Sequence, residues 1–151
     1  MGNDLAASNV NRSYSLAATS IAIFTFMLFF LYPRFGSGEI NAFLFQSTLV
    51  VIGVATFSFV FASFYYYCAS LVGYCDDAEK AVYSRRADRL WLLGAALLFL
   101  DPSLILFSLG LLVVGSAWLA LWLVYLVFLI HYVPGMQTTQ KRSREGEMGA
   151  D

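Results

Sequence analysis

Long apolar stretches alternate with short polar segments along the chain. Residues 13–33 and 40–75 contain no charged side chain, and residues 90–134 contain one, Asp101. A transmembrane helix needs about 20 mostly apolar residues, each adding about 1.5 Å to its length. The first two stretches therefore predict one membrane span each. The third is too long for one span and predicts a hairpin of two.

The strongest helix-start signal within the third stretch is Asp101-Pro102-Ser103. Aspartate is a favoured N-cap residue, and proline suits the first position of a helix. We therefore expect the third span to end before Asp101 and the fourth to begin after Pro102. Because residues 90–100 alone are too short to cross, the third span must also carry basic residues into the head-group region by snorkelling. These are Arg85, Arg86 and Arg89.

An alternative places the hairpin turn near Gly110. It gives two spans of ordinary length but leaves Asp101 and Pro102 within the membrane. An aspartate at the centre of a spanning helix costs about 2.5–3.5 kcal/mol on insertion scales, and the segment around Gly110 offers little polar turn chemistry. These two considerations favour the turn at Asp101.

The spans predict an all-α fold, a polytopic membrane protein built as a four-transmembrane-helix bundle over residues 13–134. The spans are about residues 13–33, 40–74, 79–100 and 103–133. Residues 1–12 are expected to form a polar N-terminal tail and residues 135–151 a flexible, charged C-terminal tail. Both tails are expected to be mobile.

Basic residues are distributed unevenly between the two sides of these spans. Eight of the nine Lys and Arg residues fall on the side that holds both termini, and Arg34 falls on the other. Short loops rich in Lys and Arg stay in the cytoplasm. The sequence therefore predicts a multi-pass protein of the cell membrane with both termini in the cytoplasm.

Small residues recur every seven positions along the second span. Seven residues make two turns in a left-handed supercoil, so these residues predict one helix-packing face, with Ile52, Phe59 and Tyr66 as large neighbours. The face consists of Thr48, Ala55, Thr56, Ala62, Ser63, Ala69 and Ser70. It packs either within the monomer's own bundle or at a subunit interface of a homo-oligomer. The small residues expected to receive it are Ala18, Ala22, Gly94, Ala95, Gly115, Ser116 and Ala120.

Composition excludes several classes of function. The chain is 60% hydrophobic and 13% charged with a net charge of −1, so it lacks the clustered positive charge of a nucleic-acid-binding protein. One histidine and two cysteines seven residues apart predict no metal site from one chain. We find no nucleophile, base and acid at a readable spacing, and no motif that marks a known family. We therefore expect no cofactor and no enzymatic activity.

Two functions agree with this pattern. The first is a non-catalytic helix-packing accessory protein or complex subunit, whose partners are the lipid bilayer and either itself or another membrane protein. The second is a homo-oligomeric channel or carrier for an ion or small solute. An enzyme acting on a lipid-soluble substrate is a weaker third hypothesis. The candidate functional polar residues are Arg34, Gln46, Asp101 and His131. If the turn lies at Asp101, this carboxylate is expected to pair with Arg34 at the outer surface.

Overall fold

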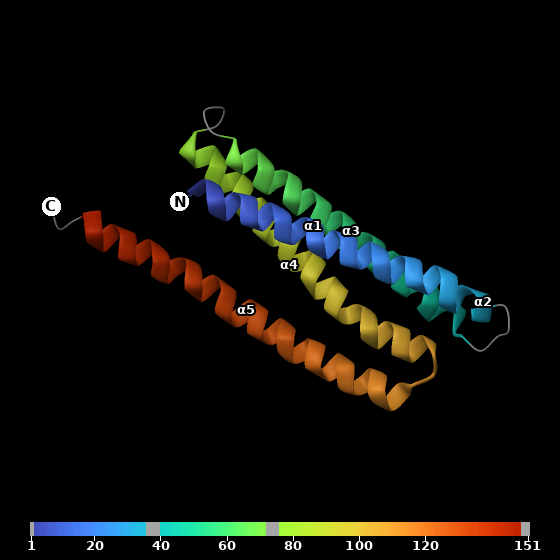
Figure 1. Ribbon diagram of the computed structural model, residues 1–151. Coiled ribbons are helices and arrows are strands. Elements are labelled where there is room, and N and C mark those ends of the chain that lie inside the picture. The colour runs from blue at the N-terminus through green and yellow to red at the C-terminus, as the bar shows by residue number, and fades with distance from the viewer. Residues whose placement is uncertain (1, 36–39, 72–75, 149–151) are drawn as a thin grey trace.

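The computed structural model describes residues 2–35, 40–71 and 76–148. Within these ranges all regular structure is helical (Figure 1). The elements are α1 (Gly2–Phe26), a π-helical turn η1 (Met27–Leu31), α2 (Tyr32–Phe35), α3 (Ala42–Ser70), α4 (Asp77–Ser108) and α5 (Leu112–Met148). Four segments are long and apolar enough to cross a membrane: Ala7–Arg34, Ala42–Ser70, Ala78–Ser108 and Leu112–His131. The prediction of an all-helical chain with four such helices is confirmed.

Helices α1, α3 and α4 form a closely packed group, with α3 packed against both of the others. Residues seven apart are buried on each helix, as in a left-handed supercoil. The buried positions are Ser13 and Ser20 on α1, with Met27 at the start of η1; Phe45, Ile52, Phe59 and Tyr66 on α3; and Ala87, Gly94, Asp101 and Ser108 on α4. Large side chains of α3 thus face the small residues of α4.

The contact between Phe59 and Gly94 shows how closely these helices approach. A Cβ atom added to Gly94 would lie 3.0 Å from Cε1 of Phe59, closer than side chains normally pack. Phe59 itself is fully buried. Glycine thus gives the aromatic ring room, and a larger residue here would push the ring aside.

Two hydrogen bonds fix the beginning of α3. The side chain of Asn41 accepts a hydrogen bond from the backbone N–H of Leu44 at 3.1 Å, the usual role of asparagine at an N-cap. The backbone N–H of Asn41 donates to the carbonyl of Ser108 at 3.0 Å. The start of α3 is therefore joined to the end of α4.

The first span contains a wide turn just before Pro33. In η1 the N–H of Tyr32 donates to the carbonyl of Met27, five residues earlier. Such π-turns hold one more residue than an α-helical turn. Met27 is fully buried, so the wide turn begins in the packed region and ends on the segment that carries Arg34.

Helix α5 packs mainly against α4, and the two helices separate toward the C-terminal end of α5 (Figure 1). The indole Nε1 of Trp122 donates to the carbonyl of Ala96 at 2.8 Å, and that of Trp118 donates to the carbonyl of Phe99 at 3.2 Å. Gly115 lies against the ring of Phe107. These contacts lie along one side of α5, and most apolar residues of its described part, Leu112–His131, are exposed.

The predicted hairpin turn at Asp101-Pro102 is wrong. Helix α4 runs through Pro102 to Ser108, and the turn lies at residues 109–111, as in the alternative. Gly110 has φ of +76°, a left-handed conformation that suits glycine and ends the helix. Pro102 removes only one backbone donor, and the two indole bonds from α5 reach carbonyls in the turns just before it. Packing therefore outweighs the local signal.

The segments expected to be flexible tails are helical. Helix α1 begins at Gly2, and α5 continues to Met148. The polar sequence at each end thus continues the adjoining apolar helix, and α5 does so through Pro134 and Gly135.

Candidate functional site

Asp101 is the charged residue buried most deeply among the described residues. It is 1% exposed, on the face of α4 that α3 covers. Ser108, where α4 ends, is seven residues further on, so Asp101 lies about 10 Å inside the end of the helix. It is therefore within the span but not at its centre.

The register between α3 and α4 places Asp101 opposite Ile52. Phe59 packs on Gly94, and the two helices run in opposite directions. Asp101 follows Gly94 by seven residues, and Ile52 precedes Phe59 by seven. Because seven residues return to the same face of a supercoiled helix, the carboxyl group lies at the level of a fully buried isoleucine.

Neither oxygen of the Asp101 carboxyl group has a hydrogen-bond partner among the described residues. The buried hydroxyl groups of the bundle donate to carbonyls of their own helices instead. Thr48 donates to Leu44 O at 2.8 Å, and Ser103 donates to Leu100 O at 2.8 Å. A buried polar group without a partner costs about 1–3 kcal/mol, and an unpaired ionised one costs more. Burial of the Asp101 carboxyl group therefore lowers the stability of the bundle.

The other candidate polar residues do not join Asp101. Arg34, Gln46 and His131 are exposed, on α2, α3 and α5 respectively. The predicted pair between Arg34 and Asp101 does not form, since the carboxyl group accepts no hydrogen bond. The prediction failed because it depended on a turn at Asp101.

The predicted packing face of α3 divides into two parts. Thr48, Ala55, Ala62 and Ser63 are fully buried against the neighbouring helices. Thr56, Ala69 and Ser70 are partly exposed. Of the small residues expected to receive this face, Gly94 and Ala95 are buried on α4, whereas Gly115 packs against Phe107 of α4.

The remaining small residues lie elsewhere than expected. Ala18 and Ala22 on α1, and Ser116 and Ala120 on α5, are exposed. The expectation that they receive the face of α3 is therefore wrong for these four. They lie on outer surfaces of the helices because α1 and α5 turn other sides toward the bundle.

A polar cluster near the start of α4 has no counterpart in the sequence-based expectations. The hydroxyl of Tyr66 donates to Oδ1 of Asp88 at 2.6 Å. The guanidinium of Arg12 lies 4.3 Å from the ring centroid of Trp91. These pairs join residues far apart in the chain. The heptad position of Tyr66 marked it as buried, but no local pattern identified its partner.

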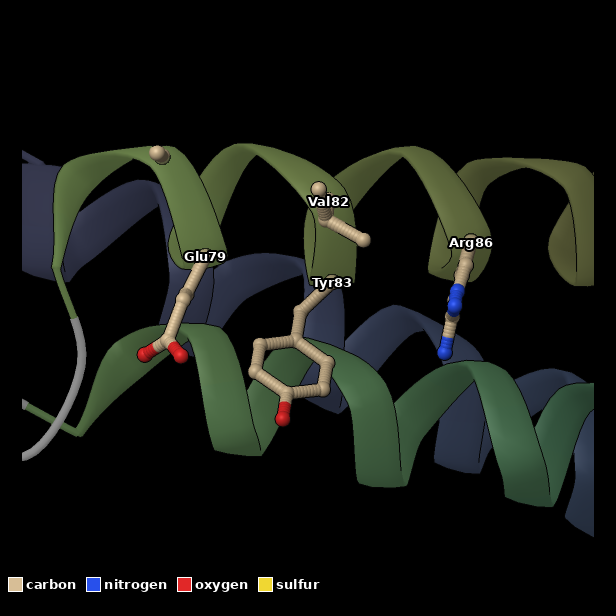
Figure 2. A pocket seen from close by; sticks show the side chains of 5 residues that line it. Glu79, Val82, Tyr83 and Arg86 are labelled. Carbon is tan, nitrogen blue, oxygen red and sulfur yellow. The ribbon is translucent and has the colours of Figure 1, made fainter.

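A shallow hollow of about 320 Å³ lies beside this end of α4. Figure 2 shows Glu79, Tyr83 and Arg86 projecting from one side of the helix. The ring of Tyr83 stacks on that of Tyr65 from α3, with centroids 6.2 Å apart. The hollow contains one carboxylate and one guanidinium without a nucleophile beside them, an arrangement typical of a solvated helix end.

Among the residues whose side chains the structure describes, no three His, Cys, Asp or Glu side chains come together as metal ligands would. Comparison with models of known families, with characterised proteins and with solved structures gave no match. Two features of this molecule bear on its function, the buried Asp101 and the loosely attached α5.

Proposed function

We propose that the protein is a non-catalytic membrane subunit that binds the transmembrane helix of another protein, or of a second copy, through the outer face of α5. The observation that carries the proposal is the poor coverage of this helix. Few residues of its span Leu112–His131 are buried, whereas α3 is covered on a whole face.

The side chains on the outer face of α5 suit close contact between helices. By helical periodicity, the face opposite α4 carries small and β-branched residues, all of them exposed: Val113, Ser116, Ala117, Ala120, Val124 and Val127. Helices associate in lipid through close van der Waals approach, which small residues permit. Ser116 Oγ donates to the carbonyl of Leu112 at 2.8 Å, so its hydroxyl is satisfied within the helix and presents no cost at such a contact.

Photo-crosslinking in the native membrane tests this proposal. A photoreactive phenylalanine analogue at Ala120 should give a protein adduct, whereas the same analogue at Phe57, exposed on α3, should not. The double variant Ser116→Leu, Ala120→Leu, probed from Val113, should lose the adduct and keep its melting temperature. Val50→Leu, an exposed control on α3, should keep the adduct.

The adduct's mass identifies the partner as a second copy or another protein. Equal adducts at Ala120 and Phe57, or an adduct that survives the double variant, would contradict the use of the α5 face.

We also propose that both termini face the cytoplasm at the cell membrane. The two termini lie at the same end of the helices (Figure 1), the end that also carries eight of the nine basic residues. A reporter active only outside the cytoplasm should give signal when fused after Gly36 and none when fused after Met136. The reverse pattern would overturn the orientation.

A carrier or channel is a second candidate, and the buried Asp101 favours it. Ionisable side chains within membrane bundles commonly lie on ion or proton pathways. Uptake of protons or alkali cations into proteoliposomes should then be lost in Asp101→Asn and retained in Glu79→Gln, whose carboxylate is exposed. Absence of flux through the wild-type protein would exclude this candidate and leave the subunit function.

A further inference from the structure

A second cavity, of about 310 Å³, is lined by residues of α1, α3 and α4. Its lining is largely apolar and includes Leu16 from α1, Phe59 from α3, and Trp91, Leu98 and Phe99 from α4. Among the described residues of the lining, Arg12 is the only charged one. The cavity is therefore an apolar groove with one cation.

Helix α5 borders the groove. The ring of Tyr125 lies 4.9 Å from that of Phe99, and its hydroxyl is within electrostatic reach of Arg12. Since Phe99 also lines the groove, this contact places α5 at its edge. Its apolar lining runs from Trp91 to Phe99, about 12 Å along α4.

Arg12 lies where the chain changes from polar to apolar. On α1 it is followed by an uncharged stretch, residues 13–33, and on α4 its stacking partner Trp91 follows the charged segment that ends at Arg89. Among the described residues no carboxylate forms an ion pair with Arg12; the nearby Asp88 accepts the Tyr66 hydroxyl instead. The guanidinium is thus held by an aromatic ring at head-group level, with donors available to an anion.

We propose that this groove binds one bilayer phospholipid with an anionic head group, from the leaflet on the side of the N-terminus. The head-group phosphate pairs with Arg12, and an acyl chain runs between α1 and α5 over Leu98 and Phe99. A transmembrane helix is about 10 Å wide, too thick for a cavity of about 310 Å³, whereas an acyl chain is thin enough.

Native mass spectrometry of the protein released from nanodiscs tests the proposal. The nanodiscs contain equal amounts of phosphatidylglycerol and phosphatidylcholine. Wild-type protein should retain one lipid molecule and should retain phosphatidylglycerol about fivefold more often than phosphatidylcholine. This is the factor expected for one basic residue near a membrane surface. Arg12→Gln should reduce this preference to about equal retention, whereas Arg85→Gln, an exposed arginine at the same end, should keep it.

A second variant separates the acyl chain from the head group. Ser15→Trp places bulk at an exposed position of the groove wall and should reduce retention of both lipids. Added inorganic phosphate should not displace the lipid if the chain contributes to binding. An unchanged preference in Arg12→Gln, or full displacement by phosphate, would overturn the proposal. The lipid would lie on the side of α5 toward α1, away from the outer face of α5 used in the crosslinking test. Loss of lipid retention and loss of the crosslinked adduct can therefore be told apart.

Discussion

The three helices α1, α3 and α4 and the single helix α5 are all apolar enough to cross a membrane, but they are held by different means. In the group, large side chains of α3 face small residues of α4, as Phe59 does Gly94. Helix α5 is attached by two indole hydrogen bonds and a few aromatic contacts. Hydropathy alone therefore does not indicate how firmly a membrane helix is held; the alternation of large and small residues does.

The largest expected effect comes from removing a large residue of the α3 face. Ile52→Ala should lower the free energy of unfolding by about 3 kcal/mol, because Ile52 is fully buried and its removal leaves a cavity. Asp101→Ala, opposite it, should instead raise stability by about 1 kcal/mol, because it removes an unpartnered buried carboxyl group. Unfolding in mixed micelles, followed by circular dichroism, measures both. A lower free energy of unfolding in both variants would mean that Asp101 has a stabilising partner.

The next effect comes from enlarging a small residue of α4. Gly94→Leu should destabilise the bundle by about 2 kcal/mol, since its side chain would overlap the Phe59 ring. Gly53→Leu is the matched control, because an added Cβ there meets nothing within 4 Å, and it should change stability by less than about 0.5 kcal/mol. Equal tolerance of both substitutions would refute the close packing of α3 on α4.

A smaller effect is expected for the polar contact between the same helices. Tyr66→Phe should cost about 1.5 kcal/mol, because it removes the 2.6 Å hydrogen bond to the Asp88 carboxylate. Tyr67→Phe, on the exposed side of α3, should have little effect in the same unfolding assay. If the two variants were equally stable, the bond between Tyr66 and Asp88 would contribute nothing to the bundle.

The smallest effect on unfolding is expected in α5. Trp122→Phe should cost about 1 kcal/mol, because it removes the bond to the Ala96 carbonyl while keeping an aromatic ring. The distribution of distances between spin labels on α4 and α5 should broaden clearly, whereas the midpoint of the unfolding transition should shift only slightly. A large loss of global stability would show that α5 is an integral part of the three-helix group.

The sequence was sufficient for the four helices and for part of the buried face of α3, since both follow from periodic patterns; Thr56, Ala69 and Ser70 of the predicted face are partly exposed. It misplaced the hairpin turn because Asp101-Pro102 carries a local helix-start signal, and only contacts with α3 and α5 keep α4 continuous through it. It also could not assign small residues to surfaces. Ala18 and Ala120 match the buried Ala62 in size, and their exposure depends on which side of each helix faces the bundle. The pair of Arg12 and Trp91 depends on the same long-range arrangement.

The π-helical turn η1 changes the direction in which the later side chains of the first span point. A turn with one extra residue rotates the subsequent chain by about 100° relative to an uninterrupted α-helix. Deleting Phe29 would remove the extra residue and convert η1 to an ordinary turn, so Met27 would keep its packing and Arg34 its direction. The same deletion in an α-helical part of the span would instead rotate Arg34 by about 100°. The π-turn is thus a place where the first span can lose one residue while the segments on both sides stay in register.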